Sequence, residues 1–117
     1  MTIREVVQLL KAVVHTGEHL LELNVQSACS ADLMSDVMAF SKENAMLLTG
    51  LVNPQVIRTA EMLDIRAVIF VRGKKPQEAM VQLAGEKDII LISTDYSLFV
   101  ASGKLYEKGI NGYGEQR

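Results

Sequence analysis

Residues 45–93 read AMLLTGLVNPQVIRTAEMLDIRAVIFVRGKKPQEAMVQLAGEKDIILIS, in which short apolar runs alternate with amphipathic segments. The apolar runs contain almost no polar side chain, which is typical of strands that are covered on both faces of a sheet. Strands that alternate with helices at this spacing predict parallel β-α-β units. The three predicted strands span residues 45–49, 67–71 and 89–93.

Helix signals fill the intervals between these strands. Asn53 is a favourable N-cap, and Pro54 follows it at the first helical position, where its missing N–H costs nothing. Pro76 is expected to open the next helix and Gly85 to end it.

The rest of the chain continues the alternation. Apolar residues at helical spacing predict further helices, capped by Thr2, Ser30 and Asp95. We therefore expect an α/β fold with a mainly parallel sheet of about five strands, in one domain over residues 1–108, followed by a flexible tail at 109–117. The additional predicted elements are helices at 2–12, 31–41 and 96–108, and strands at 12–15 and 25–29.

Composition narrows the class of protein. The 117 residues are 49% hydrophobic and carry a net charge of −2, without the basic excess that a nucleic-acid binder shows. Cys29 is the one cysteine, so we expect a reduced thiol and a cytoplasmic protein. No apolar run approaches the ~20 residues of a membrane span, and the N-terminal sequence does not predict a signal peptide.

Polar residues follow the predicted strands, at the rim where ligands bind in open parallel sheets. Their side chains suit an anionic metabolite or a nucleotide, with Arg72 as the charge clamp. The alternative is structural: glycines relieve backbone strain, Ser30 and Asp95 cap helices, and Arg72 is solvated. We interpret the corner at 72–75 as structural and keep an anion contact through Arg72 as the alternative. The candidate ligand residues are Ser30, Asp32, Thr49, Gly50, Arg72, Gly73, Thr94 and Asp95.

Signatures of catalysis are missing from the sequence. Neither the G-x-x-x-x-G-K-[ST] loop nor a G-x-G-x-x-G fingerprint occurs. His15 and His19 lack a nearby third metal ligand, and Cys29 lacks an evident base. We expect no enzymatic activity, no metal site and no cofactor.

The segment at 32–40 has an apolar face broader than a core stripe. Its Met34, Met38 and Phe40 are candidates for an interface, either with a second copy of the chain or with a partner protein.

The pattern over most of the chain resembles the DRTGG domain. The best markers are Thr49-Gly50, Gly73 with Pro76 three residues later, and the strand-to-helix run at 92–101. That domain lies beside paired CBS domains in some family II inorganic pyrophosphatases, and it is similar to the N-terminal domain of HPr kinase/phosphorylase. The resemblance implies a parallel α/β fold, a homodimer and a regulatory role without chemistry of its own.

The sequence also departs from that family. Leu51-Val52 stand where the family has an Asp-Arg pair, and the corner reads Val71-Arg72-Gly73 in place of Thr-Gly-Gly. The resemblance is therefore to a divergent, stand-alone member. In the pyrophosphatases the adenine nucleotides are held by the CBS pair, so the resemblance assigns no nucleotide to these residues.

Two hypotheses follow for the function. The first is a non-catalytic regulatory or ligand-sensing domain that acts as a homodimer and modulates a partner enzyme or complex. The second is a protein-protein interaction or assembly subunit that binds no small molecule.

Overall fold

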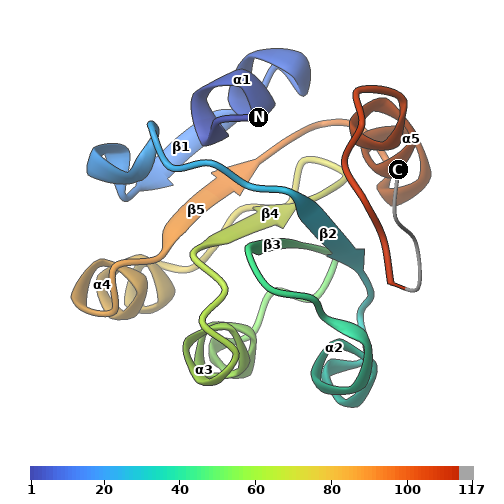
Figure 1. The fold of residues 1–117 in the computed structure, drawn as a ribbon. Coiled ribbons are helices and arrows are strands. Elements are labelled where there is room, and N and C mark those ends of the chain that lie inside the picture. Colours follow the sequence, from blue (N-terminus) through green and yellow to red (C-terminus); the bar gives the residue numbers. More distant parts are fainter. Residues whose placement is uncertain (114–117) are drawn as a thin grey trace.

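A computed structural model describes residues 1–113 as one five-stranded sheet with helices on both sides (Figure 1). The strand order is β1-β5-β4-β3-β2; β2 to β5 run parallel, and β1 runs antiparallel to β5. The predicted α/β fold with a mainly parallel sheet is confirmed. None of the helices in this range is long and apolar enough to cross a membrane. The strands are β1 (Val13–Thr16), β2 (Ser27–Ser30), β3 (Ala45–Thr49), β4 (Ala67–Phe70) and β5 (Ile90–Ser93); the helices are α1 (Ile3–Leu9), the 3-10 turn η1 (Glu18–Leu20), α2 (Met34–Phe40), α3 (Pro54–Met62), α4 (Glu78–Glu86) and α5 (Leu98–Glu107).

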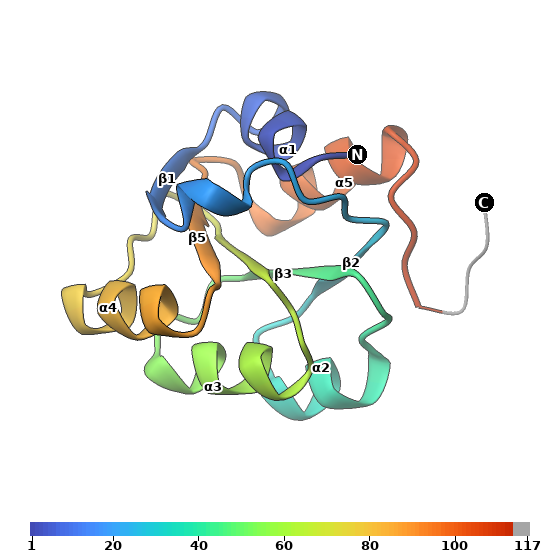
Figure 2. The ribbon, with the colours of Figure 1, turned by 60° about the vertical axis from the view of Figure 1, so that its left-hand side comes forward.

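The helices form two layers around the sheet. Because β2 to β5 step in one direction across the sheet, crossovers of one hand place α2, α3 and α4 on the same face. The helices α1 and α5 cover the other face (Figure 2).

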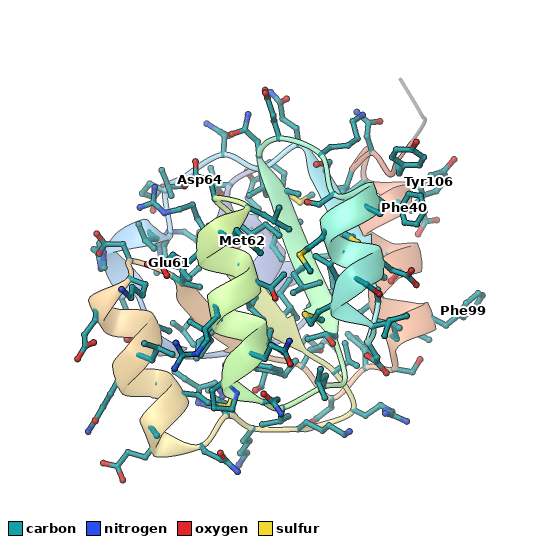
Figure 3. The ribbon with its side chains drawn as sticks, turned by 90° about the horizontal axis from the view of Figure 1, so that it is seen from below. Phe40, Glu61, Met62, Asp64, Phe99 and Tyr106 are labelled. Atoms are coloured by element: carbon teal, nitrogen blue, oxygen red, sulfur yellow. The ribbon has the colours of Figure 1, made fainter. Side chains whose placement is uncertain are left out.

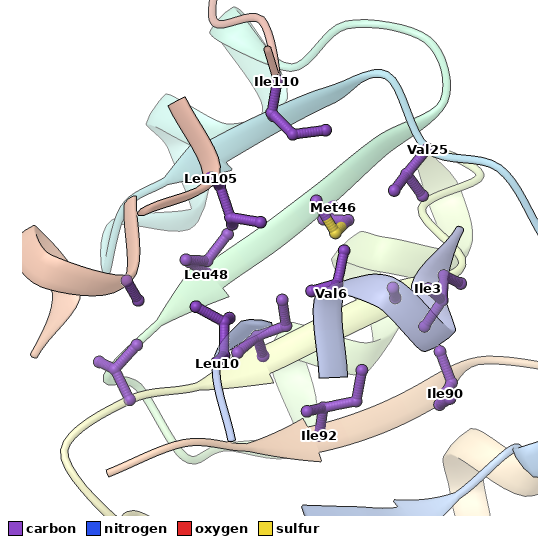
Figure 4. Packing of buried hydrophobic residues seen from close by; sticks show 14 of the residues in the cluster. Ile3, Val6, Leu10, Val25, Met46, Leu48, Ile90, Ile92, Leu105 and Ile110 are labelled. Atoms are coloured by element: carbon purple, nitrogen blue, oxygen red, sulfur yellow. The ribbon is translucent and has the colours of Figure 1, made fainter. Parts of the chain in front are cut away.

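Both faces of the sheet are buried, which explains the uninterrupted apolar strands. Met46 and Leu48 of β3 pack with α1 and α5, together with Ile3 and Ile90 (Figure 4). Leu47 lies between them and packs on the opposite face with α2, α3 and α4. Every residue of β3, β4 and β5 is buried, as expected for strands between two helical layers.

The predicted helix caps are confirmed at Thr2 and Asn53 and are wrong elsewhere; the Thr2 hydroxyl accepts from the Glu5 N–H at 3.2 Å. The Asn53 side chain accepts a hydrogen bond from the Gln55 N–H at 2.8 Å, which confirms the predicted cap of α3. Ser30 does not cap a helix, because the N–H of Ala31 continues the sheet by donating to the Leu48 carbonyl at 3.1 Å. The helix α2 starts only at Met34.

Two further helix ends differ from the sequence prediction. Ser97, rather than Asp95, caps α5; its hydroxyl accepts from the Val100 N–H at 3.2 Å. The helix α4 starts two residues after Pro76, and Gly85 lies inside it. The chain reverses instead at Asp88, whose φ is 55°.

The first part of the expected tail is anchored to the sheet. Ile110 is buried, the N–H of Asn111 donates to the Gln26 carbonyl at 3.0 Å, and the N–H of Ala28 donates to the Asn111 carbonyl at 2.9 Å. Residues 110–111 therefore lie along the outer edge of β2. Residues 114–117 lie outside the described range, and for them the flexible tail stays a prediction.

Candidate ligand site

The carboxyl ends of β2 to β5 meet at one rim of the sheet. In the strand register Thr49 pairs with Phe70, and Phe70 pairs with Ser93. Gly50, Arg72 and Thr94 therefore follow adjacent strand ends, as the sequence predicts for a parallel sheet.

Asp32 ties the end of β2 to the end of β3. Its Oδ1 accepts hydrogen bonds from the Gly50 N–H at 2.7 Å and from the Thr49 hydroxyl at 3.1 Å. The Thr49 hydroxyl oxygen in turn accepts from the Leu51 N–H at 3.1 Å. One carboxylate oxygen of Asp32 is thus structural, and Oδ2 is left to accept from another donor.

The corner after β4 is a tight turn with two consecutive residues at positive φ. Arg72 has φ of 57° and Gly73 has φ of 70°. The N–H of Lys74 donates to the Val71 carbonyl at 3.2 Å, which closes a turn of type I′. Glycine and asparagine favour such positions, whereas an arginine there is strained.

The loop between β5 and α5 holds this turn in place. The N–H of Arg72 donates to the Tyr96 carbonyl, and the N–H of Gly73 donates to the Thr94 carbonyl, both at 2.9 Å. The strain at Arg72 is therefore imposed by the surrounding backbone. Strain of this kind concentrates at functional sites.

The side chains of Arg72 and Asp32 flank Gly50. A Cβ atom on Gly50 would lie 3.0 Å from Nη2 of Arg72, and 3.5 and 3.6 Å from the two carboxylate oxygens of Asp32. Among residues 1–113, no carboxylate forms an ion pair with Arg72. Nearby Lys74 differs, because its Nζ donates to the Gly50 carbonyl at 2.7 Å.

A cavity of about 280 Å³ opens between these groups and the start of α5. The N–H groups of a first helical turn lack partners within the helix and carry partial positive charge. The site therefore combines a guanidinium, a helix N-terminus and one available carboxylate oxygen. It is lined by Asp32, Gly50, Val71, Arg72, Ser97, Leu98 and Phe99.

The residues from the start of α5 were not among the predicted site residues. The sequence prediction takes Asp95 as the helix cap, which places the helix start two residues too early. Ser97 is an equally good cap by residue type, and it was the only available signal for this wall of the cavity.

Three of the predicted ligand residues line this cavity, and the others serve different roles or lie beside it. Thr94 is only 2% exposed, and its hydroxyl donates to the Leu10 carbonyl at 2.8 Å, which ties the end of α1 to the rim. Thr49 is buried and bonded to Asp32. Gly73 and Asp95 lie together beside the cavity, because a Cβ on Gly73 would be 3.1 Å from Oδ1 of Asp95.

A serine and a histidine meet near the rim without forming a catalytic pair. Nε2 of His15 lies 2.8 Å from the Ser93 hydroxyl, but this hydroxyl donates its proton to the Lys74 carbonyl at 2.7 Å. The histidine is therefore the donor to Ser93 and does not activate it as a base. Burial, and to a smaller extent the charge of Lys75, lowers the pKa of His15.

Cys29 has the properties of a structural thiol. Burial, and to a smaller extent the charge of Asp36, raises the pKa of Cys29, so little reactive thiolate forms at neutral pH. Within residues 1–113, no three side chains of His, Cys, Asp or Glu are grouped as metal ligands.

The predicted interface residues divide between core and surface. Met34 is buried under α2, where it packs against the core. Met38 and Phe40 are 47% and 46% exposed. Figure 3 shows Phe40 on the same side of the molecule as Phe99 and Tyr106 of α5.

Comparison with known proteins identifies one informative neighbour. No family model and no curated protein matches the chain. Among solved structures, the chain is similar to the CBS and DRTGG domains of the regulatory region of Clostridium perfringens pyrophosphatase, which was solved in complex with its activator, diadenosine tetraphosphate. The TM-score is 0.74 at 16% identity, over 95% of this chain and 50% of that chain. The likeness shows a DRTGG-like fold, and this chain spans half the length of the solved region.

Proposed function

We propose that this protein is a non-catalytic regulatory domain that senses an anionic small molecule at the carboxyl rim and modulates a partner enzyme or complex. The proposal rests on the backbone conformation of Arg72 and on the surroundings of its guanidinium. Its backbone is held at an unfavourable positive φ, its guanidinium reaches a cavity, and no carboxylate of the described chain pairs with it.

The chemistry of the cavity matches an anion that also carries hydrogen-bond donors. Arg72 and the first N–H groups of α5 favour a phosphate or a carboxylate. The hydroxyl of Ser97 accepts from the Val100 N–H, so its proton is available to such a group. The second oxygen of Asp32 accepts from a ligand hydroxyl or amino group, which selects against a bare anion.

The solved neighbour supports the class of function. It belongs to the regulatory region of an enzyme and was solved with a nucleotide activator. A related role for this chain makes a nucleotide a candidate ligand and an enzyme a candidate partner. A ligand that binds one conformation of the domain more tightly would increase the fraction of the domain in that conformation, and the partner would respond to this change.

Thermal unfolding in the presence of a ligand panel tests the proposal. The panel contains orthophosphate, pyrophosphate, acetyl phosphate and nucleoside mono-, di- and triphosphates. At a hundredfold excess over its Kd, a ligand that binds only the folded state adds about 2.7 kcal/mol, or about 10 °C for a domain of this size. The shift should be clearly smaller in Arg72→Asn at the same ligand concentration. No shift across the panel would contradict sensing.

The homodimer is part of the proposal and rests on the exposed apolar side chains of α2. Met38 and Phe40 are half-exposed, and Leu33 at the start of α2 is 61% exposed. Burying them against a second copy would remove this apolar surface from water. Light scattering after gel filtration should give twice the chain mass, and Met38→Glu should give the monomer mass with an unchanged circular dichroism spectrum. A monomeric wild type would contradict the dimer.

The same surface favours a second candidate function, an assembly subunit without a small-molecule ligand. This candidate predicts no thermal shift with the panel and co-purification of a specific protein. Met38→Glu should then abolish that complex. Persistence of the complex with this variant would exclude α2 as the contact surface.

A further inference from the structure

A second cavity lies against the first, on the outer side of β2. Its volume is about 390 Å³, and Phe99 lines both cavities. The end of β2 and the first half of α5 each contribute to the two cavities: Ser30 and Ser102 line the second, whereas Asp32 and Ser97 line the first. The two cavities therefore lie side by side and share Phe99, and we call the pair the groove.

The walls of the second cavity differ in chemistry from those of the first. They are mainly apolar, with Ala28 and Leu105 among them, and they include no charged side chain. The polar lining residues are Tyr106, Asn111 and a pair of serines, whose hydroxyl oxygens Ser30 Oγ and Ser102 Oγ lie 2.7 Å apart. Oδ1 of Asn111 is buried and has no hydrogen-bond donor among the described residues.

The aromatic ring of Phe99, which lines both cavities, is exposed to solvent. The side chain of Phe99 is 86% exposed, the largest exposure of any large apolar residue in the described chain. A flat ring stacked on it would cover apolar surface, and stacking tolerates any planar heterocycle. The serine hydroxyls can donate hydrogen bonds to the ring edge and can accept one from an exocyclic amino group.

The spacing along α5 fits a single molecule that fills both cavities. Ser102 follows Ser97 by five residues, a rise of about 7.5 Å along the helix. This separation suits a phosphate at Arg72 joined through a sugar to a ring beyond Phe99. The free oxygen of Asp32 lies on the same strand end as Ser30 and would accept from a sugar hydroxyl between them.

We infer that the groove binds a nucleotide, with its phosphate at Arg72 and its base in the 390 Å³ cavity between β2 and α5. This inference rests on the proposed sensing function and extends it to the class of ligand. A bare phosphate would occupy only the polar half and leave Phe99 uncovered.

Isothermal titration with orthophosphate and with AMP, GMP, CMP and UMP tests the inference. The best nucleotide should bind at least tenfold more tightly than orthophosphate, since base stacking alone contributes about that factor. Phe99→Ala should remove that advantage, so that the best nucleotide binds this variant no more tightly than orthophosphate does.

A filled-cavity variant gives an independent test. A Cβ on Gly103 has no atom within 4 Å, and Gly103 lines the second cavity. Gly103→Met should therefore fold, gain helix propensity and block the base. Gly103→Ala is the matched control, which gains helix propensity while leaving most of the cavity open.

The outcomes separate this inference from the proposed function. If orthophosphate binds and no nucleotide binds more tightly, the base site is wrong and anion sensing stands. If no panel member binds, both fail. Nucleotide binding that Phe99→Ala and Gly103→Met leave intact would overturn the base site, and so would loss of the dimer in Gly103→Met, because the cavity would then be an interface.

Discussion

Both ends of the parallel strands carry charged side chains, but among residues 1–113 the ion pairs near the strand ends lie at the amino end. At the amino end, Lys87 Nζ lies 3.1 Å from Glu61, and His19 Nε2 lies 2.9 Å from Asp88. Nε of Arg66 donates to the Asp88 carbonyl at 3.0 Å. Figure 3 shows Glu61 at this end of α3, close to Asp64. Lys87, His19 and Arg66 therefore each have a partner within the protein.

The carboxyl end has a different arrangement. Lys74 bonds to a backbone carbonyl and one oxygen of Asp32 bonds to backbone and hydroxyl groups, yet Arg72 has no ion pair in the described chain. A cation beside a helix N-terminus adds to the positive potential of that end. A bound anion would therefore find a cation that is unpaired among residues 1–113, and a helix N-terminus, at the carboxyl end of the strands.

Positive φ has two different roles in the chain. Asp64 and Asp88 at the amino end, and Lys11 at the carboxyl end, have positive φ shortly after α3, α4 and α1, where the chain reverses from helix to strand. Arg72 has positive φ at a strand end, in a turn that asparagine and glycine would form more easily. Positive φ at Lys11, Asp64 and Asp88 thus reverses the chain after a helix, whereas at Arg72 it follows a strand and directs a guanidinium.

The largest effect is expected from Gly17→Ala, at the amino end of β5. Gly17 has φ of 92°, and a Cβ there would lie 2.6 Å from the Cα of Ile90, so backbone must move. We expect the free energy of unfolding to fall by about 3 kcal/mol or more, measured by urea denaturation. Gly85→Ala is the control: its Cβ makes only an ordinary contact with Thr16, and it should stabilise α4 by roughly 0.5–1 kcal/mol. A loss below 1 kcal/mol for Gly17→Ala would contradict this structural role.

Arg72→Asn should separate stability from binding. Asparagine tolerates positive φ, so the free energy of unfolding should rise by roughly 0.5–1 kcal/mol. Loss of a charged hydrogen-bond donor should weaken ligand binding by roughly ten- to hundredfold. Urea denaturation and titration with the best panel ligand measure the two quantities on the same protein.

Arg72→Lys is the matched control for that variant. Lysine keeps the charge and the strained backbone but lacks the planar pair of donors. Its stability should equal that of the wild type, with intermediate affinity. If Arg72→Asn gained stability and lost no affinity, Arg72 would be a solvated corner residue, as the sequence-based interpretation favours.

Gly50→Ala tests the geometry of the carboxyl end with a smaller change. Gly50 does not have positive φ, so alanine is allowed, and its Cβ would meet Nη2 of Arg72 at 3.0 Å. The flexible guanidinium should move aside, so stability should change by less than about 0.5 kcal/mol, while affinity falls several-fold. A large loss of stability would mean that the Arg72 side chain is fixed, and an unchanged affinity would place the ligand elsewhere.

The sequence correctly predicts that the candidate site lies at the carboxyl rim of the sheet. It predicts less well which side chains line the cavity there. Apolar runs and the Asn53-Pro54 cap identify the strands and therefore the rim, because parallel strand ends meet at one edge. The direction of a hydroxyl is set by tertiary contacts. Thr94 turns inward to the Leu10 carbonyl, and Ser30 pairs with Ser102, 72 positions away.

The same limit applies to the helix surface. Met34 and Met38 are both compatible with the apolar face of α2, yet only Met38 is exposed, because α3 and the sheet decide which side of that face is covered. Arg72 was named from its position after β4, but its strain depends on the bonds from the β5–α5 loop. No local sequence pattern predicts those backbone hydrogen bonds.

The smallest effect is a pH dependence at the carboxyl end. Burial, and to a smaller extent the charge of Lys75, lowers the pKa of His15. A lowered pKa means that the unfolded chain binds a proton at His15 more readily than the folded chain. The stability that His15 contributes is therefore complete above its ordinary pKa of ~6.5 and declines as the pH falls through that value towards the folded pKa. Urea denaturation at pH 8 and pH 5.5 should show a smaller decline for His15→Gln than for the wild type, and an NMR titration should give His15 a midpoint below ~6.5. A midpoint above that value would mean that an anionic group of the protein faces His15 at this rim, and the proposed contrast between the two ends of the sheet would be wrong.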